Sequence, residues 1–108
     1  MKLASLVLLS TIFGPAAAET VKCPASLDGK PLSLASANFD KQTQIHGDHR
    51  SFNWGYVIGL PLNVKWLVCE YGEAQKWIAV KDGEKSKRCT LTARRGNQGL
   101  TSAELACN

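Results

Sequence analysis

Four cysteines carry the clearest chemistry in this sequence: Cys23, Cys69, Cys89 and Cys107. Zinc ligands usually come in close pairs, about two to four residues apart, whereas these cysteines are separated by 46, 20 and 18 positions. An even number of widely spaced cysteines in a short chain is typical of disulfides formed in an oxidising compartment. The spacing therefore predicts two disulfide bonds.

The segment His46-Gly47-Asp48-His49 is the one cluster in the sequence with the character of metal ligands. Two imidazoles and a carboxylate could hold zinc or a related ion, which would make the chain a small metal-binding protein or a hydrolase. However, histidines three positions apart in a loop fix no geometry, and the sequence contains no third histidine. We expect a solvated loop with neither a metal nor another cofactor.

The sequence lacks the common motifs of covalent catalysis. It has neither a Cys-x-x-Cys redox pair nor a Gly-x-Ser-x-Gly nucleophile elbow. Two carboxylates that meet in space could hydrolyse a glycoside, and the candidates are Asp40 with Asp48 or Glu70 with Glu73. Such pairs meet only in space, so the sequence by itself leaves this alternative open. Because the motifs of covalent catalysis are missing, we predict that the protein is not an enzyme.

Aromatic and basic side chains give the best indication of a binding surface. Apolar side chains in the stretch 66–71 alternate onto both faces of a strand, so one face needs a second layer or a partner. Residues 76–95 hold seven basic and two acidic side chains, which could also be a solvated hairpin face. The aromatics could equally fill a small barrel or sandwich. If they form an interface, the binding residues are Trp54, Tyr56, Trp66, Trp77, Arg88 and Arg94.

The first 18 residues have the three parts of a secretory signal peptide. Lys2 precedes the apolar run 3–13, and Ala16-Ala17-Ala18 forms a small-residue cleavage site. The apolar run is shorter than the roughly 20 residues that span a bilayer. We expect a periplasmic or secreted product without stable membrane insertion, folded as one disulfide-stapled domain over residues 19–108.

The pattern after residue 18 predicts an all-β or mainly β domain. Strand formers bounded by Gly, Pro and Asp-Gly signals predict a strand at 32–39, a polar loop over 40–53, and then four strands that pair in chain order as an antiparallel meander. After a turn at 96–99, residues 101–104 match a helix capping box, so the C-terminus is either a short helical turn or a return strand. The expected fold is a small antiparallel sandwich or open barrel. The four meander strands span residues 54–60, 63–71, 75–80 and 88–94. In the last of them Cys89, Leu91 and Ala93 alternate with polar residues and are expected to point inward.

Strand order and disulfide pairing constrain each other. If the C-terminus returns as a strand, a hairpin centred near Gln98 sets Cys89 opposite Cys107, as a cross-strand disulfide requires. In a meander the strand 75–80 would hold Cys69 and Cys89 about 9 to 10 Å apart, beyond the roughly 7 Å limit for a bridge. We favour Cys89–Cys107 with Cys23–Cys69. The nested set, Cys69–Cys89 with Cys23–Cys107, stays open if the sheet is ordered differently.

Several short motifs resemble those of an uncharacterised family of small exported proteins of Gram-negative bacteria. They are Cys23-Pro24, the stretch Trp66-Leu67-Val68-Cys69-Glu70-Tyr71, Arg88-Cys89-Thr90-Leu91 and a cysteine next to the C-terminus. The resemblance implies a periplasmic location and brings no active site. A weaker similarity is to small periplasmic lysozyme inhibitors, which are disulfide-containing β-barrels. Their Ser-Gly-x-x-Tyr loop has no counterpart after Cys69, so no inhibitory residue is carried over.

These observations together predict an exported binding protein. Its partner would be another envelope or extracellular protein, which it would bind or inhibit as inhibitors and immunity-type proteins do. Nucleic acid is not expected as a partner, because the basic cluster is small and export removes the chain from most nucleic acid. This functional expectation rests on exclusion and analogy rather than on a site.

Overall fold

The computed structural model describes residues 19–60, 64–81 and 88–108, which form two antiparallel β-sheets and a short hairpin. No part of the described chain forms a helix with the length and hydropathy needed to cross a bilayer. In spatial order the five-stranded sheet holds β1 (Glu19–Lys22), β11 (Gly99–Cys107), β10 (Cys89–Gly96), β7 (Gly55–Leu60) and β6 (Asp48–Phe52). The four-stranded sheet holds β5 (Thr43–Gln44), β4 (Leu34–Asp40), β8 (Trp66–Tyr71) and β9 (Ala74–Ala79). The separate hairpin pairs β2 (Ser26–Leu27) with β3 (Lys30–Pro31).

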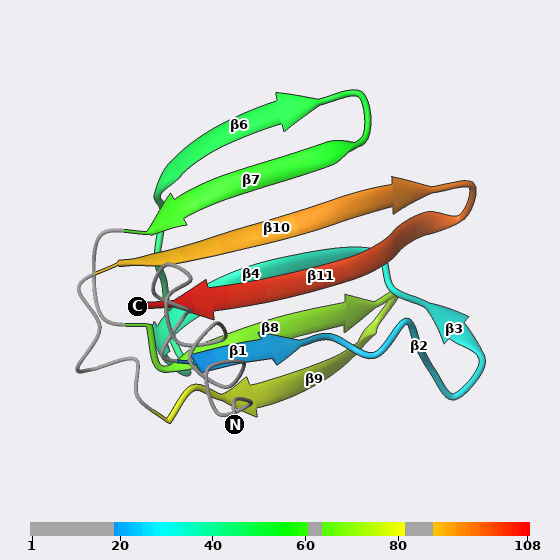
Figure 1. Ribbon diagram of the computed structural model, residues 1–108. Coiled ribbons are helices and arrows are strands. Elements are labelled where there is room, and N and C mark those ends of the chain that lie inside the picture. Colours follow the sequence, from blue (N-terminus) through cyan, green and yellow to red (C-terminus); the bar gives the residue numbers. More distant parts are fainter. Residues whose placement is uncertain (1–18, 61–63, 82–87) are drawn as a thin grey trace, which may run out of the picture.

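The two sheets lie one behind the other, with the core between them (Figure 1). Along β10, the side chains of Cys89, Leu91 and Ala93 are buried while the alternate positions are less so, because successive side chains of a strand point to opposite faces. The same alternation buries Leu67 and Tyr71 of β8 against them from the other sheet. The predicted all-β fold with antiparallel sheets and inward-facing β10 residues is confirmed.

The predicted meander is wrong, because consecutive strands change sheet twice. β8 and β9 form the expected hairpin across the two-residue link 72–73. By contrast, β7 pairs with β6 and β10, and β8 pairs with β4, so β7 and β8 belong to different sheets, as do β9 and β10. A two-residue link forces its strands to pair, whereas the longer links 61–65 and 80–88 allow the chain to cross between layers.

Residues 40–53 are not the predicted loop, since they contain β5 and β6. All five residues of β6 are exposed, because this strand is the edge of its sheet and one of its sides has no neighbour in the described chain. An exposed edge strand needs no apolar face, so its composition resembles that of a loop. The C-terminus is a strand and not a helical turn. It pairs with both β10 and β1, and it buries Ala103, Leu105 and Cys107 at alternate positions.

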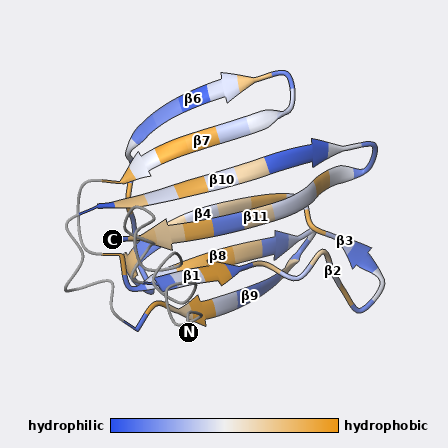
Figure 2. Cartoon of the chain, in the orientation of Figure 1, coloured by the Kyte–Doolittle hydropathy of each residue, from blue (hydrophilic) through white to orange (hydrophobic). Residues whose placement is uncertain are grey.

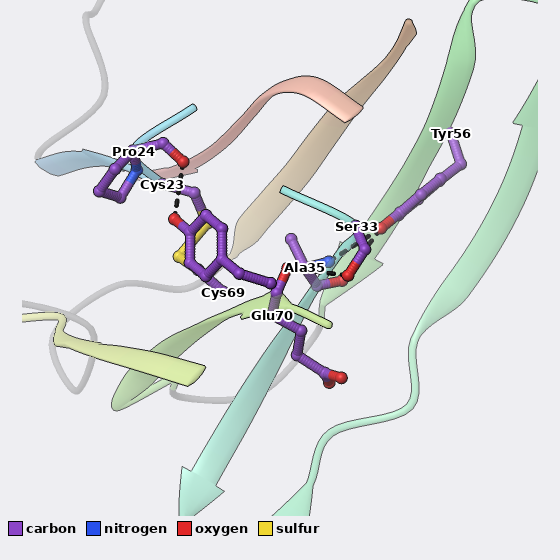
Figure 3. Close-up of a disulfide and its surroundings, with 8 residues drawn as sticks. Cys23, Pro24, Ser33, Ala35, Tyr56, Cys69 and Glu70 are labelled. Carbon is purple, nitrogen blue, oxygen red and sulfur yellow. Dashed lines mark hydrogen bonds between the residues drawn. A yellow bond between two sulfur atoms is a disulfide. The ribbon is translucent and has the colours of Figure 1, made fainter. Parts of the chain in front are cut away.

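Both favoured disulfides are confirmed, although for one of them the reasoning differs. Cys89 lies directly opposite Cys107 in the β10–β11 ladder, and their Cα atoms are 4.1 Å apart. The register shifts by one between Arg94 and Arg95, so the hairpin is not symmetric about Gln98 along its whole length. Cys69 is remote from Cys89 because it lies in the other sheet. It bonds instead to Cys23, at a Cα separation of 5.7 Å, and so ties the two layers together (Figure 3).

Candidate functional site

The outer face of the five-stranded sheet carries a hollow of about 500 Å³. We call it the β7 hollow. Residues that lie opposite each other in antiparallel strands share a face, and the register places Asp48 of β6, Gly59 of β7 and Thr90 of β10 in one row across the sheet. The next row along these strands contains Arg50 and Val57. These five residues line the hollow together with Arg88.

The hollow exists because its central row has a glycine in the middle. A Cβ added to Gly59 would find no atom closer than the Asp48 Cβ at 3.8 Å, so the space above this residue is open. Gly47 has the opposite role. Its Cβ would lie 2.0 Å from the Gly59 carbonyl oxygen, so only glycine lets the chain run so close to β7. Gly59 thus leaves the floor of the hollow open, and Gly47 lets the neighbouring chain lie close beside it.

The charge around the β7 hollow is mainly positive. Arg50 Nε lies 3.4 Å from Asp48 Oδ2, but both side chains are 71% exposed, and such surface ion pairs contribute only about 0 to 1 kcal/mol. Arg50 is therefore available to a ligand. Arg88 borders the other side, and its backbone is held by two hydrogen bonds with Asn108, of 3.3 and 3.0 Å. Guanidinium groups recognise carboxylates and phosphates through paired hydrogen bonds.

An exposed aromatic and basic cluster follows at the β6–β7 turn. The rings of Phe52 and Trp54 are stacked with centroids 5.0 Å apart, and Arg94 Cζ lies 4.8 Å from the centroid of a Trp54 ring. The two aromatic residues are 43% and 41% exposed. We call Phe52, Trp54 and Arg94 the tip cluster. In Figure 2 the end of β10 beside this turn is strongly hydrophilic. The structure therefore brings two predicted binding residues, Trp54 and Arg94, into direct contact.

Backbone contacts hold the tip cluster in place. The Arg95 N–H donates to the Trp54 carbonyl oxygen at 2.7 Å. Gly55 follows with a φ of 152°, and a Cβ there would lie 1.9 Å from the Ala93 carbonyl oxygen. A glycine is needed at this point because β7 and β10 approach closely where the turn ends. The cluster is consequently fixed to the same three strands that form the β7 hollow.

Tyr56 is a core residue and not part of a surface. It is only 7% exposed, and its ring stacks on His49 at 5.2 Å between centroids. Its hydroxyl donates to the Ala35 carbonyl oxygen at 3.1 Å and accepts the Ala35 N–H at 3.2 Å (Figure 3). Burial raises the pKa of this phenol above its ordinary 10.0. Tyr56 thus joins β7 to β4 at a position where the side of β4 that faces away from β8 has no strand beside it.

Trp66 and Trp77 lie on the other outer face of the molecule. Trp66 is on β8 and Trp77 on β9, and their rings meet edge to face with centroids 6.0 Å apart. Val68 points to the same face as Trp66. It is only 2% exposed, yet it does not belong to the core between the sheets. Apart from the buried Tyr56, the predicted binding residues therefore separate into two surfaces on opposite sides of the fold.

The predicted metal ligands are divided between two faces. His46 and Asp48 border the β7 hollow, whereas His49 points to the inner face and packs on Tyr56. Within residues 19–60, 64–81 and 88–108, no group of three His, Cys, Asp or Glu side chains is arranged to hold a metal. The carboxylate pair Asp40 and Asp48 is also split, since the two residues belong to strands of different sheets.

Three contributors to these surfaces were missed by sequence reasoning: Arg50, Phe52 and Gly59. The first two lie in the stretch that was interpreted as a loop. Asp48, Arg50 and Phe52 recur at every second position, a signal that would have placed them on one face had β6 been recognised as a strand. No feature of the sequence identifies Gly59 as the floor of a hollow. Comparisons with protein-family models, with curated proteins and with solved structures found no match to this chain.

Proposed function

We propose that this protein is an exported binding protein, periplasmic or secreted, whose β7 hollow and tip cluster engage an acidic surface of another envelope or extracellular protein. The observation that carries the proposal is a set of three arginines on one face of the five-stranded sheet. Arg50 and Arg88 border the glycine-floored hollow, and Arg94, on the same face of the sheet, lies against Trp54 of the exposed, stacked aromatic pair. Arginine and tryptophan side chains dominate the energetic centres of protein interfaces.

A compartment outside the cytoplasm fits the proposal. Two disulfides form readily in the periplasm or outside the cell and are rare in the cytosol. The signal-like residues 1–18 support the same location. A small domain stapled by two disulfides presents its binding face with little loss of conformational entropy on association, which favours tight binding by a preorganised surface.

An acidic partner follows from the charges on the face. Two arginines and one aspartate at the β7 hollow, together with Arg94 in the tip cluster, give this face a positive potential. Complementary charge accelerates association and orients the partner. The aromatic side chains, which the complex would bury, then slow its dissociation. The chain's formal net charge of +4 includes Lys2 of the signal-like segment, and the net charge of +3 that remains without it (12 basic and 9 acidic side chains) acts in the same direction.

Affinity capture from envelope extract with the oxidised protein tests the proposal. A captured protein supports it only if its binding depends on the β7 hollow and the tip cluster. Gly59→Leu fills the β7 hollow, and Trp54→Ala removes the centre of the tip cluster. Each change is expected to weaken binding of the captured partner at least about tenfold, the range of an interface hot spot. Gln75→Ala, an exposed change on the four-stranded sheet, serves as the matched control.

The salt dependence of the same interaction provides a second measurement. The affinity should fall as ionic strength rises, because screening weakens contacts between exposed charges. Arg50→Ala and Arg94→Ala should reduce this dependence. The proposal is overturned if the folded Gly59→Leu and Trp54→Ala proteins bind every captured partner as the original protein does.

A further inference from the structure

The outer face of the four-stranded sheet presents two tryptophan rings set nearly at right angles. The planes of Trp66 and Trp77 make an angle of 75°. The indole Nε1–H of Trp77 donates to Gln75 Oε1 at 3.1 Å, which fixes the orientation of that ring. Ala79 lies opposite Trp66 in the ladder, so no large side chain fills the space beside it on β9. The rings form two walls of a partly exposed corner.

A cation already occupies this corner. Lys41 Nζ lies 4.4 Å from the centroid of Trp66 and 4.6 Å from that of Trp77. Both distances are within the range in which a cation is attracted to the negative face of an aromatic ring. One ammonium group thus contacts two indoles at once, in an arrangement that resembles the aromatic cages by which proteins bind quaternary ammonium groups.

Lys41 reaches the corner from a tight turn and is not part of the walls. It lies in the two-residue link between β4 and β5, where Asp40 pairs with Thr43. Asp40 Oδ1 accepts the Gln42 N–H at 2.8 Å, and Asn38 Nδ2 donates to the Asp40 carbonyl oxygen at 3.1 Å. These bonds hold the turn without using the Lys41 side chain. The lysine can therefore leave the corner without disturbing the hairpin.

We propose that Trp66 and Trp77 form a binding site for a quaternary ammonium group, and that Lys41 is an internal competitor which occupies the site in the free protein. A primary ammonium is compact and strongly hydrated, so at an exposed position it gains little from the rings. A trimethylammonium group spreads its charge over methyl groups that can pack on both indoles. The ligand class is therefore a small choline-like molecule.

This site is independent of the β7 hollow. It lies on the other sheet, shares no residue with the tip cluster and attracts a cation rather than an anion. Failure of the proposed partner binding would leave it unaffected, and its own failure would not bear on the acidic partner.

Tryptophan fluorescence can test the proposal with tetramethylammonium as the probe. A Trp54→Phe background restricts the signal to Trp66 and Trp77, because the sequence has three tryptophans. If Lys41 fills the corner about nine-tenths of the time, Lys41→Ala in this background should bind the probe about tenfold more tightly than the protein that keeps Lys41. Lys41→Arg, which retains a cation on a long side chain, should bind as weakly as the Lys41 protein.

Choline and its neutral isostere 3,3-dimethylbutan-1-ol separate charge from shape. Choline should saturate the Lys41→Ala site and the isostere should not, since cation–π attraction requires the positive charge. Trp66→Leu and Trp77→Leu, each added to Lys41→Ala and each checked for folding by circular dichroism, should abolish the response. Using two single-wall variants keeps the test informative if one of them does not fold.

Three outcomes would overturn the proposal. An unsaturable response of the folded Lys41→Ala protein to tetramethylammonium excludes the site. Equal binding of choline and the neutral isostere excludes recognition of the charge. Equal affinities with and without Lys41 exclude its role as the competitor.

Discussion

A single phenol in this protein replaces part of a missing strand. The second side of β4 pairs with β5 only from Asn38 onward, so the backbone of Ala35 would lack partners on that side. Tyr56, from the opposite sheet, supplies both a donor and an acceptor to Ala35. Buried backbone groups without partners are costly, so the Tyr56 hydroxyl makes the two hydrogen bonds that a neighbouring strand would otherwise make with Ala35.

Replacing Tyr56 by phenylalanine should lower the free energy of unfolding by about 1 to 3 kcal/mol, because two buried backbone groups lose their partner. Tyr71→Phe is the matched comparison. It removes one hydroxyl bond, to the Pro24 carbonyl oxygen at 2.6 Å, and should cost less, about 1 kcal/mol. Urea unfolding of the oxidised proteins measures both values. A loss for Tyr71→Phe as large as that for Tyr56→Phe would contradict the account.

The same hydroxyls should make the fold sensitive to alkali. Burial raises the pKa of Tyr56 and of Tyr71 above 10.0, so the folded protein favours the neutral phenols. Their contribution to stability is complete below the pKa of the unfolded chain and is lost as the pH rises through the higher pKa of the folded state. Unfolding free energies measured between about pH 9 and about pH 11 should fall, and should fall less steeply in Tyr56→Phe. Identical slopes would exclude Tyr56 as a source.

At the scale of strands, the sequence predicts which face of a strand a side chain occupies better than it predicts which strands pair. Cys89, Leu91 and Ala93 were correctly assigned to the inside of β10 because alternation is a local property. β6 was missed because an exposed edge strand has no apolar face. Pairing failed for a different reason: sheet membership depends on contacts between residues far apart in the chain, and a link longer than a tight turn does not specify them.

The candidate surfaces were foreseen only in part for the same physical reason. Trp54 and Arg94 are forty positions apart, and they touch because β7 pairs with β10. Trp66 and Trp77 meet because β8 and β9 form the hairpin that the sequence did predict. The floor of the β7 hollow could not be foreseen, since it depends on which side chains stand beside Gly59.

The two glycines of β7, Gly55 and Gly59, should differ in how much a larger side chain destabilises the fold. Gly59→Leu enters open space and should change the unfolding free energy by no more than about 1 kcal/mol. Gly55→Leu would press its Cβ against the Ala93 carbonyl oxygen at a φ of 152°, and should cost at least about 2 kcal/mol. Urea unfolding of the two variants measures the difference. Equal costs would contradict the open hollow.

At the scale of the whole molecule, the two disulfides differ in what they join. Cys89–Cys107 reinforces two strands that already pair, whereas Cys23–Cys69 connects the sheets. The sequence separations are 18 and 46 residues. Loop entropy in the unfolded chain grows with this separation, which gives about 3 and about 4 kcal/mol respectively.

Removing the bond between the sheets should therefore destabilise the fold more. From loop entropy alone, the free energy of unfolding should fall by about 1 kcal/mol more in Cys23→Ala/Cys69→Ala than in Cys89→Ala/Cys107→Ala. The loss of contact between the two layers should destabilise the first variant further. Urea unfolding of the two double variants under one buffer condition compares them. The reverse order of stability would show that loop entropy does not set the contribution of these bonds.

The pairing of β1 with β11 fixes when the domain can be completed. Every residue of β1 has its partner in β11, so the five-stranded sheet cannot be completed before Gly99–Cys107 joins it. The Cys89–Cys107 bond needs only the β10–β11 pair, whereas the Cys23–Cys69 bond needs both layers to be in place. The contacts that complete this sheet thus join the two ends of the described chain, and such long-range pairing is slow to form, so β1 stays unpaired until the rest of the sheet has folded.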